Sequence, residues 1–170
     1  MSKWFIRPCK VDIGNMCRKM GINVPLALAL QSKGLNTPKK VKDYFNTENY
    51  NFGDITQLIG VKRSFEIIEK AINKRKKIFI YGDYDVDGVT STVILYKSLK
   101  AIGADVFYYI PNRVKDGYGL NVNAIERLIE KGMELLITCD NGIAAIEEIK
   151  YAKEKGIDVV IYDHHEPVIK

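Results

Sequence analysis

The chain has 170 residues, of which 46% are hydrophobic and 28% are charged, a balance typical of a soluble globular domain with its own core. Its most apolar stretch, VPLALAL, is far too short to span a bilayer, which excludes a membrane-spanning protein. The net charge of +5 is uneven, because residues 1–77 hold 16 of the 26 Lys and Arg but only 6 of the 21 Asp and Glu; the basic part can attract a polyanion or simply form solvated helix faces, and the acidic part can attract metal cations.

The first sixty residues predict a small basic helical segment. Its opening, MSKWFIRPCK, lacks the apolar core of a secretory signal. One helix is predicted over residues 23–35, with Gly34 at its C-terminus, and another over 37–45, where Thr37 fits an N-cap and a proline follows it. The turn-rich stretch NTENYNFGD indicates a boundary. We therefore expect residues 1–60 and 61–170 to form separate parts.

From residue 61 onward, helices alternate with strands. After a helix at 61–73, strands are predicted at 77–81, 104–110, 133–139 and 157–163, with helices between them at 89–103, 121–132 and 144–156. Helical connections of this length join parallel strands, and near-continuous apolar strands require a sheet that is covered on both faces. The predicted fold class is therefore α/β: a Rossmann-like three-layer domain with a parallel sheet.

Polar residues follow every predicted strand. In chain order, the segments are GDYDVDG, PNRVKDGYGLN, DNG and DHHEP. Ligands of open parallel sheets bind at the carboxyl ends of the strands, so we expect these segments at one rim. Asp83, Asp85 and Asp87 are spaced two residues apart, and on an extended chain they would face one pocket. Divalent cations between the carboxylates would cancel their repulsion.

Asp140 after the third strand and His164 and His165 after the fourth complete this constellation. Mixed carboxylate and imidazole ligands suit Mn²⁺, with Mg²⁺ as the alternative. Adjacent histidines on an extended chain point to opposite sides, so one can bind metal while the other reaches a phosphate oxygen. Two metal ions about 3.5–4 Å apart are the standard device for in-line phosphodiester hydrolysis.

Two other motifs share part of the pattern. DYDVDG matches the first half of a calcium-binding EF-hand loop, but Ile94 occupies the position of the essential glutamate, which excludes that site. DVDGVT resembles the DxDGxT motif of haloacid-dehalogenase phosphatases, in which Asp85 would be the nucleophile, Asp87 the general acid and Thr138 a phosphate contact. That hypothesis leaves the remaining carboxylates and both histidines without a role.

The segment PNRVKDGYGLN offers candidates for binding the substrate phosphate. Arg113 could clamp a phosphate with two hydrogen bonds, or form a surface ion pair. Gly117 and Gly119 flank Tyr118, and they would either let a backbone phosphate approach closely or form a tight turn.

Taken in order, YGDYDVDGVTST, RVKDGYGLN, CDNGI and YDHHEP resemble the motifs of the DHH phosphoesterase superfamily, and most of all its RecJ branch of single-stranded-DNA-specific 5′→3′ exonucleases. The resemblance runs from about Lys3 to His165. It implies that the metal ligands are Asp85, Asp87, Asp140 and His164, with Asp140 bridging both ions. His165 would contact the scissile phosphate and act in catalysis together with Asp83, and Asp163 would bind metal or support a ligand.

The implied function is the hydrolysis of phosphodiester bonds to 5′-mononucleotides by two Mn²⁺ or Mg²⁺ ions, in DNA repair and recombination. A water held by the ions would attack phosphorus, so no side-chain nucleophile is needed. The implied partners are single-stranded DNA and a single-strand-binding protein or a helicase, and we expect a monomer that does not bind membranes. Three cysteines without a CxxC pair fit free thiols in a reducing cytosol, which predicts a cytoplasmic protein.

This sequence departs from the family pattern in two ways. Several DHH branches carry a histidine where this chain has Tyr81, a poor ligand for divalent ions, which argues against the inorganic-pyrophosphatase branch. RecJ proteins are also much longer, with a further aspartate ligand in a second lobe and an OB-type domain, so we expect an N-terminal fragment that is inactive or nearly so by itself.

Two hypotheses from other classes stay open. One is a small-substrate phosphoesterase, such as an oligoribonuclease or a cyclic-dinucleotide hydrolase. The other is a non-catalytic binding module, although a chain without catalysis would have no reason to keep so many like charges together.

Overall fold

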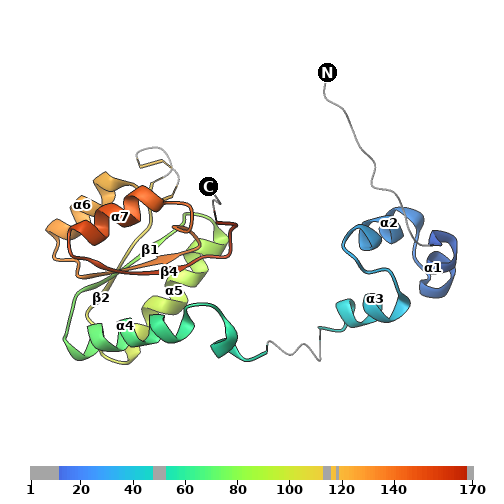
Figure 1. The fold of residues 1–170 in the computed structure, drawn as a ribbon, viewed down its shortest axis with the longest axis horizontal. Coiled ribbons are helices and arrows are strands. Elements are labelled where there is room, and N and C mark those ends of the chain that lie inside the picture. The colour runs from blue at the N-terminus through green and yellow to red at the C-terminus, as the bar shows by residue number, and fades with distance from the viewer. Residues whose placement is uncertain (1–11, 48–52, 113–115, 118, 168–170) are drawn as a thin grey trace, which may run out of the picture. The chain divides into compact units, whose positions relative to one another are not determined.

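The computed structural model describes residues 12–47, 53–112, 116–117 and 119–167. The chain divides into two compact units, residues 1–54 and 55–170 (Figure 1). Within the described ranges, every helix is too short or too polar to cross a bilayer.

The first unit contains three short helices, α1 (Ile13–Met20), α2 (Val24–Ser32) and α3 (Pro38–Phe45). Each begins with a polar side chain that accepts a hydrogen bond from a backbone N–H of the first turn; these residues are Asp12, Asn23 and Thr37. The helices enclose a small core made of Met16, Ala27, Leu30 and Val41. The predicted helix at 37–45 and its N-cap are confirmed, whereas α1 was not predicted.

The second unit alternates helices and strands. In chain order its elements are η2 (Ile55–Gln57), α4 (Val61–Asn73), β1 (Ile78–Gly82), α5 (Val86–Ala101), β2 (Val106–Tyr109), α6 (Val122–Glu130), β3 (Leu135–Cys139), α7 (Ile146–Glu154) and β4 (Asp158–Tyr162). The strands form one parallel sheet in the order β2-β1-β3-β4. The predicted parallel α/β sheet is confirmed.

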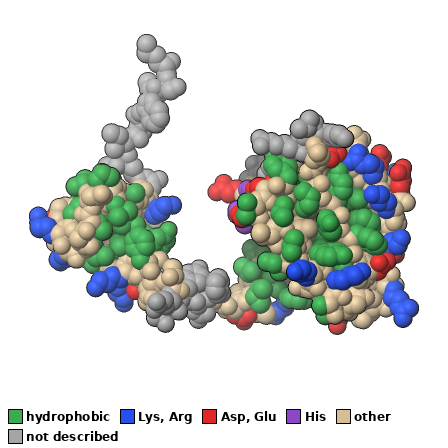
Figure 2. Space-filling model, turned by 180° about the vertical axis from the view of Figure 1, so that it is seen from behind, with side chains coloured by type: hydrophobic (Ala, Val, Ile, Leu, Met, Phe, Trp, Pro, Cys, Tyr) green, Lys and Arg blue, Asp and Glu red, His purple; other side chains and the backbone are tan. Residues whose placement is uncertain are grey.

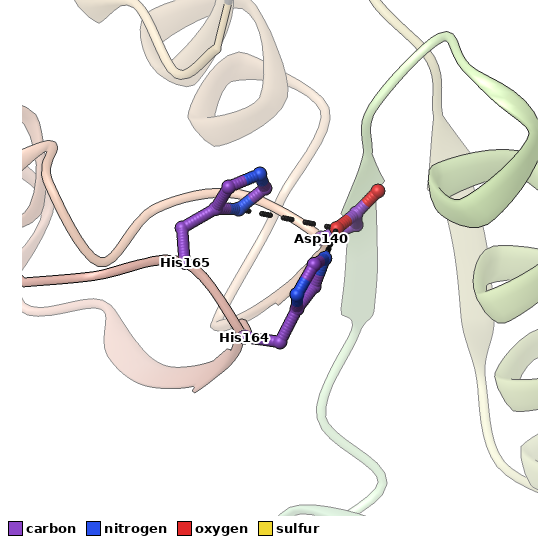
Figure 3. Close-up of side chains that lie close together, drawn as sticks. All are labelled: Asp140, His164 and His165. Carbon is purple, nitrogen blue, oxygen red and sulfur yellow. Dashed lines mark ion pairs between the residues drawn. The ribbon is translucent and has the colours of Figure 1, made fainter. Parts of the chain in front are cut away.

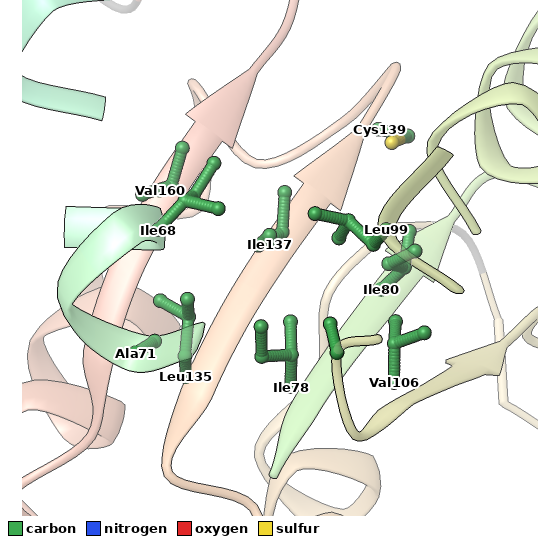
Figure 4. Packing of buried hydrophobic residues seen from close by; sticks show 11 residues of the cluster. Ile68, Ala71, Ile78, Ile80, Leu99, Val106, Leu135, Ile137, Cys139 and Val160 are labelled. Carbon is green, nitrogen blue, oxygen red and sulfur yellow. The ribbon is translucent and has the colours of Figure 1, made fainter. Parts of the chain in front are cut away.

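Helices cover both faces of this sheet. On one face, α4 and α5 pack on Ile78 and Ile80 of β1, together with side chains of β3 (Figure 4). On the other face, α6 and α7 pack on Phe79 and Tyr81. Side chains of a strand point alternately to its two sides, so β1 and β3 contribute to both cores and are buried along their whole length.

The strand order places a crevice at the carboxyl edge of the sheet. After β1 the chain turns into α5 on one face, and after β3 it turns into α7 on the opposite face. β1 and β3 are neighbours, so their following loops diverge from adjacent points. In open α/β sheets such a switch point is where ligands bind. Residues of the polar segments after β1, β3 and β4 meet there.

Candidate metal centre

The turn between β1 and α5 holds two aspartates rigidly. Asp83 is 2% exposed, its N–H donates to the Cys139 carbonyl at 3.2 Å, and its Oδ1 accepts from Tyr84 N at 2.8 Å. Asp85 is the N-cap of α5, since its Oδ1 accepts a 2.9 Å hydrogen bond from Gly88 N. Gly88 lies against the backbone of Asp83, so the start of the helix is pressed onto the end of the strand.

The three aspartates therefore do not line one side of an extended chain, and that prediction is wrong. The N-cap hydrogen bond of Asp85 turns the chain into α5 at Val86, earlier than the predicted helix start at residue 89. Asp83 and Asp85 still gather with Asp140. Asp87 lies in the first helical turn, is exposed, and lines a small pocket together with Asp140 and His164.

The turn after β3 places Asp140 between two strands. Asp140 has a left-handed backbone, with φ of 62°, and its N–H donates to the Tyr162 carbonyl of β4 at 2.8 Å. The next residue, Asn141, is buried, and its Nδ2 donates to the carbonyls of Cys139 at 3.1 Å and Tyr81 at 3.4 Å. Asn141 thus joins the ends of β1 and β3, a role that sequence analysis missed although the residue lies only two positions beyond the end of the strand.

Both histidine rings turn toward Asp140 (Figure 3). His164 Nε2 lies 3.0 Å from Asp140 Oδ1, and His165 Nδ1 lies 4.0 Å from the same atom. The expectation that the rings point to opposite sides is wrong. β4 ends at Tyr162, and the Asp163 carboxylate then accepts a 3.1 Å hydrogen bond from the backbone N–H of His165. This hydrogen bond bends the chain, whereas the sequence-based prediction is an extended chain.

Asp163 supports this arrangement with both carboxylate oxygens. Oδ1 accepts from the His165 backbone and lies 2.6 Å from His165 Nδ1, while Oδ2 accepts from Ile143 N at 3.0 Å. Burial alone would raise the pKa of Asp163, but these hydrogen bonds hold it below its ordinary value, and the same contact raises the pKa of His165. Its oxygens are already engaged, which favours the supporting role over metal ligation.

The carboxylates repel one another. Burial and the neighbouring Asp85 raise the pKa of Asp140, whereas the hydrogen bond from Gly88 lowers that of Asp85. Asp140 Oδ1 is buried, and its approach to His164 lacks hydrogen-bond geometry, so this oxygen has no hydrogen-bond partner in the described part of the chain. A divalent cation would satisfy that oxygen and neutralise the cluster.

The donor atoms form two overlapping groups that fit divalent cations. Asp83, Asp85 and Asp140 offer carboxylate oxygens, and Asp140, His164 and His165 offer one oxygen and two ring nitrogens, with each group's atoms within 4.8 Å of one another. Asp140 belongs to both groups, as a bridging ligand would. Viewed from behind, acidic and histidine side chains gather at one margin of the second unit (Figure 2).

The remaining predicted residues lie beside this cluster or outside the described residues. Gly117 and Gly119 have left-handed φ values of 80° and 73°, which glycine adopts without strain. Gly119 lines a groove of about 270 Å³ that also contains Asp163 and His165. Arg113 and Tyr118 fall outside the described residues, so their predicted phosphate contacts stay predictions.

Two buried residues bear on alternatives raised by the sequence: Tyr81 on metal ligation, and Thr138 on the dehalogenase hypothesis. Tyr81 is fully buried, and its hydroxyl donates to the Gly119 carbonyl at 3.0 Å, a structural contact that engages the phenol. Thr138 is also fully buried and therefore cannot contact a phosphate, which removes a required part of the dehalogenase hypothesis. Cys17 and Cys139 are free thiols, as predicted.

Comparison with known proteins matches residues 77–170 to the N-terminal domain of the DHH family. The single-stranded-DNA-specific exonuclease RecJ of Bacillus subtilis (strain 168) is 41% identical over 166 residues, which is 97% of this chain and 21% of that protein. RecJ of Haemophilus influenzae is 43% identical over 112 residues, 65% of this chain and 20% of that protein. The chain thus spans about a fifth of the length of these curated relatives.

Two solved structures are similar to the chain. A crystal structure of exonuclease RecJ bound to manganese superposes with a TM-score of 0.63 and 37% identity, over 66% of this chain and 29% of the other. RecJ from Thermus thermophilus in complex with Mn²⁺ superposes with a TM-score of 0.61 and 26% identity, over 93% of this chain and 22% of the other.

Proposed function

This chain belongs to the DHH family, and from that premise we propose that it forms the metal-binding part of a RecJ-type single-stranded-DNA-specific exonuclease. The activity would be 5′→3′ hydrolysis of phosphodiester bonds to 5′-mononucleotides. The observation that carries the proposal is the position of Asp140 in two overlapping groups of ligand atoms at the switch point of the sheet. The names of the relatives support the choice of single-stranded DNA as substrate.

The residues fit two divalent cations, Mn²⁺ or Mg²⁺. Asp83 and Asp85 would share one ion with Asp140, and His164 would hold the second ion with Asp140. Asp87, which lines the pocket beside Asp140 and His164, would add a carboxylate. When bound, the cations supply an activated water and neutralise charge on the phosphate.

The chain's own residues orient the substrate around that centre. Asp163 holds the Nδ1 side of His165, which leaves Nε2 to donate a hydrogen bond to a phosphate oxygen. The contact with Asp163 raises the pKa of His165, which favours the protonated ring that this donation requires. Asp85 uses Oδ1 to cap α5 and keeps its other oxygen for the centre.

The cellular setting follows from the same assignment. We propose a cytoplasmic enzyme of DNA repair and recombination that works as a monomer and meets its single strand beside a single-strand-binding protein or a helicase.

Calorimetric titration with Mn²⁺ tests the centre. The unaltered chain should bind, and Asp140→Ala and His164→Ala should each weaken binding at least about tenfold, because each removes a ligand. Asp105→Ala, an exposed aspartate beside the amino end of β2, is the matched control and should bind as the unaltered chain does. Absence of Mn²⁺ binding, or equal weakening by the control, would contradict the proposal.

Fluorescence anisotropy tests the substrate. With Mn²⁺ present, a 5′-phosphorylated single-stranded oligonucleotide should bind more tightly than a duplex of the same sequence. Equal affinity for the two would contradict the single-strand assignment and leave the metal centre unaffected.

A further inference from the structure

Building on the proposed function, we infer that Tyr81 and the Asp116–Arg127 ion pair are positioning residues that hold the wall of the groove in which the DNA strand lies beside His165. In this chain, Tyr81 thus serves the substrate groove.

The groove begins at the metal centre. Its lining comes from three segments: Gly119 and Leu120, which we call the Gly119 wall; residues 141–145 with Glu148; and Asp163 with His165. Gly119 and Gly142 have no side chains and residues 144 and 145 are alanines, so a sugar–phosphate chain could approach the backbone closely at these positions, between the larger side chains of Leu120, Ile143 and Glu148. The position of the Gly119 wall therefore sets where a bound strand can run.

Tyr81 ties that wall to the central strand. Its hydroxyl donates to the Gly119 carbonyl at 3.0 Å and accepts from Asn121 Nδ2 at 3.4 Å. Asn121 also caps α6, since its Oδ1 accepts from Ala124 N at 2.8 Å. A buried phenol is costly without hydrogen bonds, and phenylalanine would fill the same space. The hydroxyl is thus accounted for by the two partners that it joins.

Asp116 is the second anchor. Its carboxylate, 12% exposed, accepts from Asn112 N at 2.9 Å, from the Tyr109 hydroxyl at 2.8 Å and from Arg127 Nη2 at 2.7 Å. Its carbonyl accepts from Asn121 Nδ2 at 3.2 Å.

Two strands and a helix therefore hold this wall. Tyr109 belongs to β2, Arg127 to α6 and Tyr81 to β1, and the rings of Tyr81 and Tyr109 lie 5.1 Å apart. β1 ends at Gly82, and Asp83 and Asp85 follow in the turn to α5, so the strand that carries Tyr81 leads directly into the metal ligands. This linkage would fix the distance between the metal ligands and the path of the bound DNA strand.

The test compares Tyr81→Phe, Arg127→Met and the conservative Arg127→Lys with the unaltered chain. Three quantities are measured: the affinity for a 5′-phosphorylated single-stranded oligonucleotide with Mn²⁺ present, the affinity for Mn²⁺ alone, and amide hydrogen exchange at Gly119 and Leu120 without metal. Arg63→Met, which breaks the exposed pair with Glu66 on α4, is the matched control.

Tyr81→Phe and Arg127→Met should weaken oligonucleotide binding about tenfold and speed exchange at Gly119 and Leu120, while Mn²⁺ affinity stays within about twofold. Arg127→Lys should restore most of the affinity, because the ammonium can still pair with Asp116. The control should change none of the three.

Unchanged exchange in both Tyr81→Phe and Arg127→Met would overturn the inference, and so would faster exchange with unchanged oligonucleotide affinity. If the unaltered chain binds Mn²⁺ but no oligonucleotide, the groove does not hold the strand and the inference fails. Failure of the unaltered chain to bind Mn²⁺ would contradict the proposed metal centre instead, since exchange at Gly119 is measured without metal.

Discussion

Replacing Gly88 by alanine should push the start of α5 away from the end of β1. A Cβ at this position would lie 2.5 Å from the Asp83 carbonyl oxygen and 2.6 Å from both its Cα and its N. These are backbone atoms, and they cannot rotate aside as a side chain does. The Asp83 N–H also donates a 3.2 Å hydrogen bond to the Cys139 carbonyl, which holds the end of β1 against β3.

Two terms of opposite sign decide the magnitude. Alanine is favoured over glycine inside a helix by about 1 kcal/mol. Overpacking against a site that cannot relax costs about 1–3 kcal/mol, and a contact this short with backbone belongs at or above the upper end. We therefore expect Gly88→Ala to lower the free energy of unfolding by about 2 kcal/mol. The displacement should also weaken Mn²⁺ binding, because the Asp85 carboxylate accepts a hydrogen bond from Gly88 N and would shift together with it.

Urea unfolding and Mn²⁺ calorimetry on the same preparation measure both effects. Gly14→Ala in α1 is the control, because its Cβ would lie 3.4 Å from Asp12 Oδ1, an ordinary contact, and we expect unchanged or slightly greater stability. A Gly88→Ala chain at least as stable as the original, with undiminished Mn²⁺ affinity, would refute the close packing of α5 on β1.

Three further predictions concern single side chains. Asp85→Asn should keep the melting temperature, because asparagine caps helices equally well, whereas Asp85→Ala should lower it by a few degrees; both should weaken Mn²⁺ binding, and equal thermal losses would contradict the capping role. Hydrogen bonds from the Asn112 backbone N–H, the Arg127 guanidinium and the Tyr109 hydroxyl lower the pKa of Asp116. The contribution of Asp116 to the stability of the fold is therefore present above the ordinary carboxyl pKa and is lost as pH falls through the lowered value. Asp116→Asn should therefore be less stable than the original at neutral pH, with a difference that vanishes in acid; urea unfolding across pH measures it, and a constant difference would contradict the ion pair. Burial raises the pKa of Cys139 to about 11, so iodoacetamide should label Cys17 before Cys139 in the native chain, and mass spectrometry showing equal rates for Cys139 in native and unfolded chains would contradict its burial.

The sheet could be predicted from the sequence because burial on two faces leaves a clear pattern. β1 and β3 are buried throughout and largely apolar, and the predicted strands at 77–81 and 133–139 overlap Ile78–Gly82 and Leu135–Cys139. The start of α1 could not be predicted in the same way, since Gly14 and Asn15 are weak helix formers and the Asp12 cap stabilises that turn.

The members of the site were also predictable, but their orientation was not. Carboxyl ends of parallel strands meet at one edge, which is enough to bring Asp140 to His164. The cap made by Asp85 and the bend made by Asp163 are local hydrogen bonds that replace the assumed extended course. The Tyr81 contacts join segments far apart in the chain, and no local pattern records such a pairing.

The parallel order of the sheet has a kinetic consequence. The ligands follow β1, β3 and β4, and the pairing of β1 with β3 closes a loop that contains α5, β2 and α6. Such non-local pairing is slow to form, and the cation site cannot exist before it is complete. A cation that binds only the finished sheet stabilises the native state without stabilising the folding transition state. Mn²⁺ should therefore slow the unfolding of this unit and leave its rate of folding unchanged.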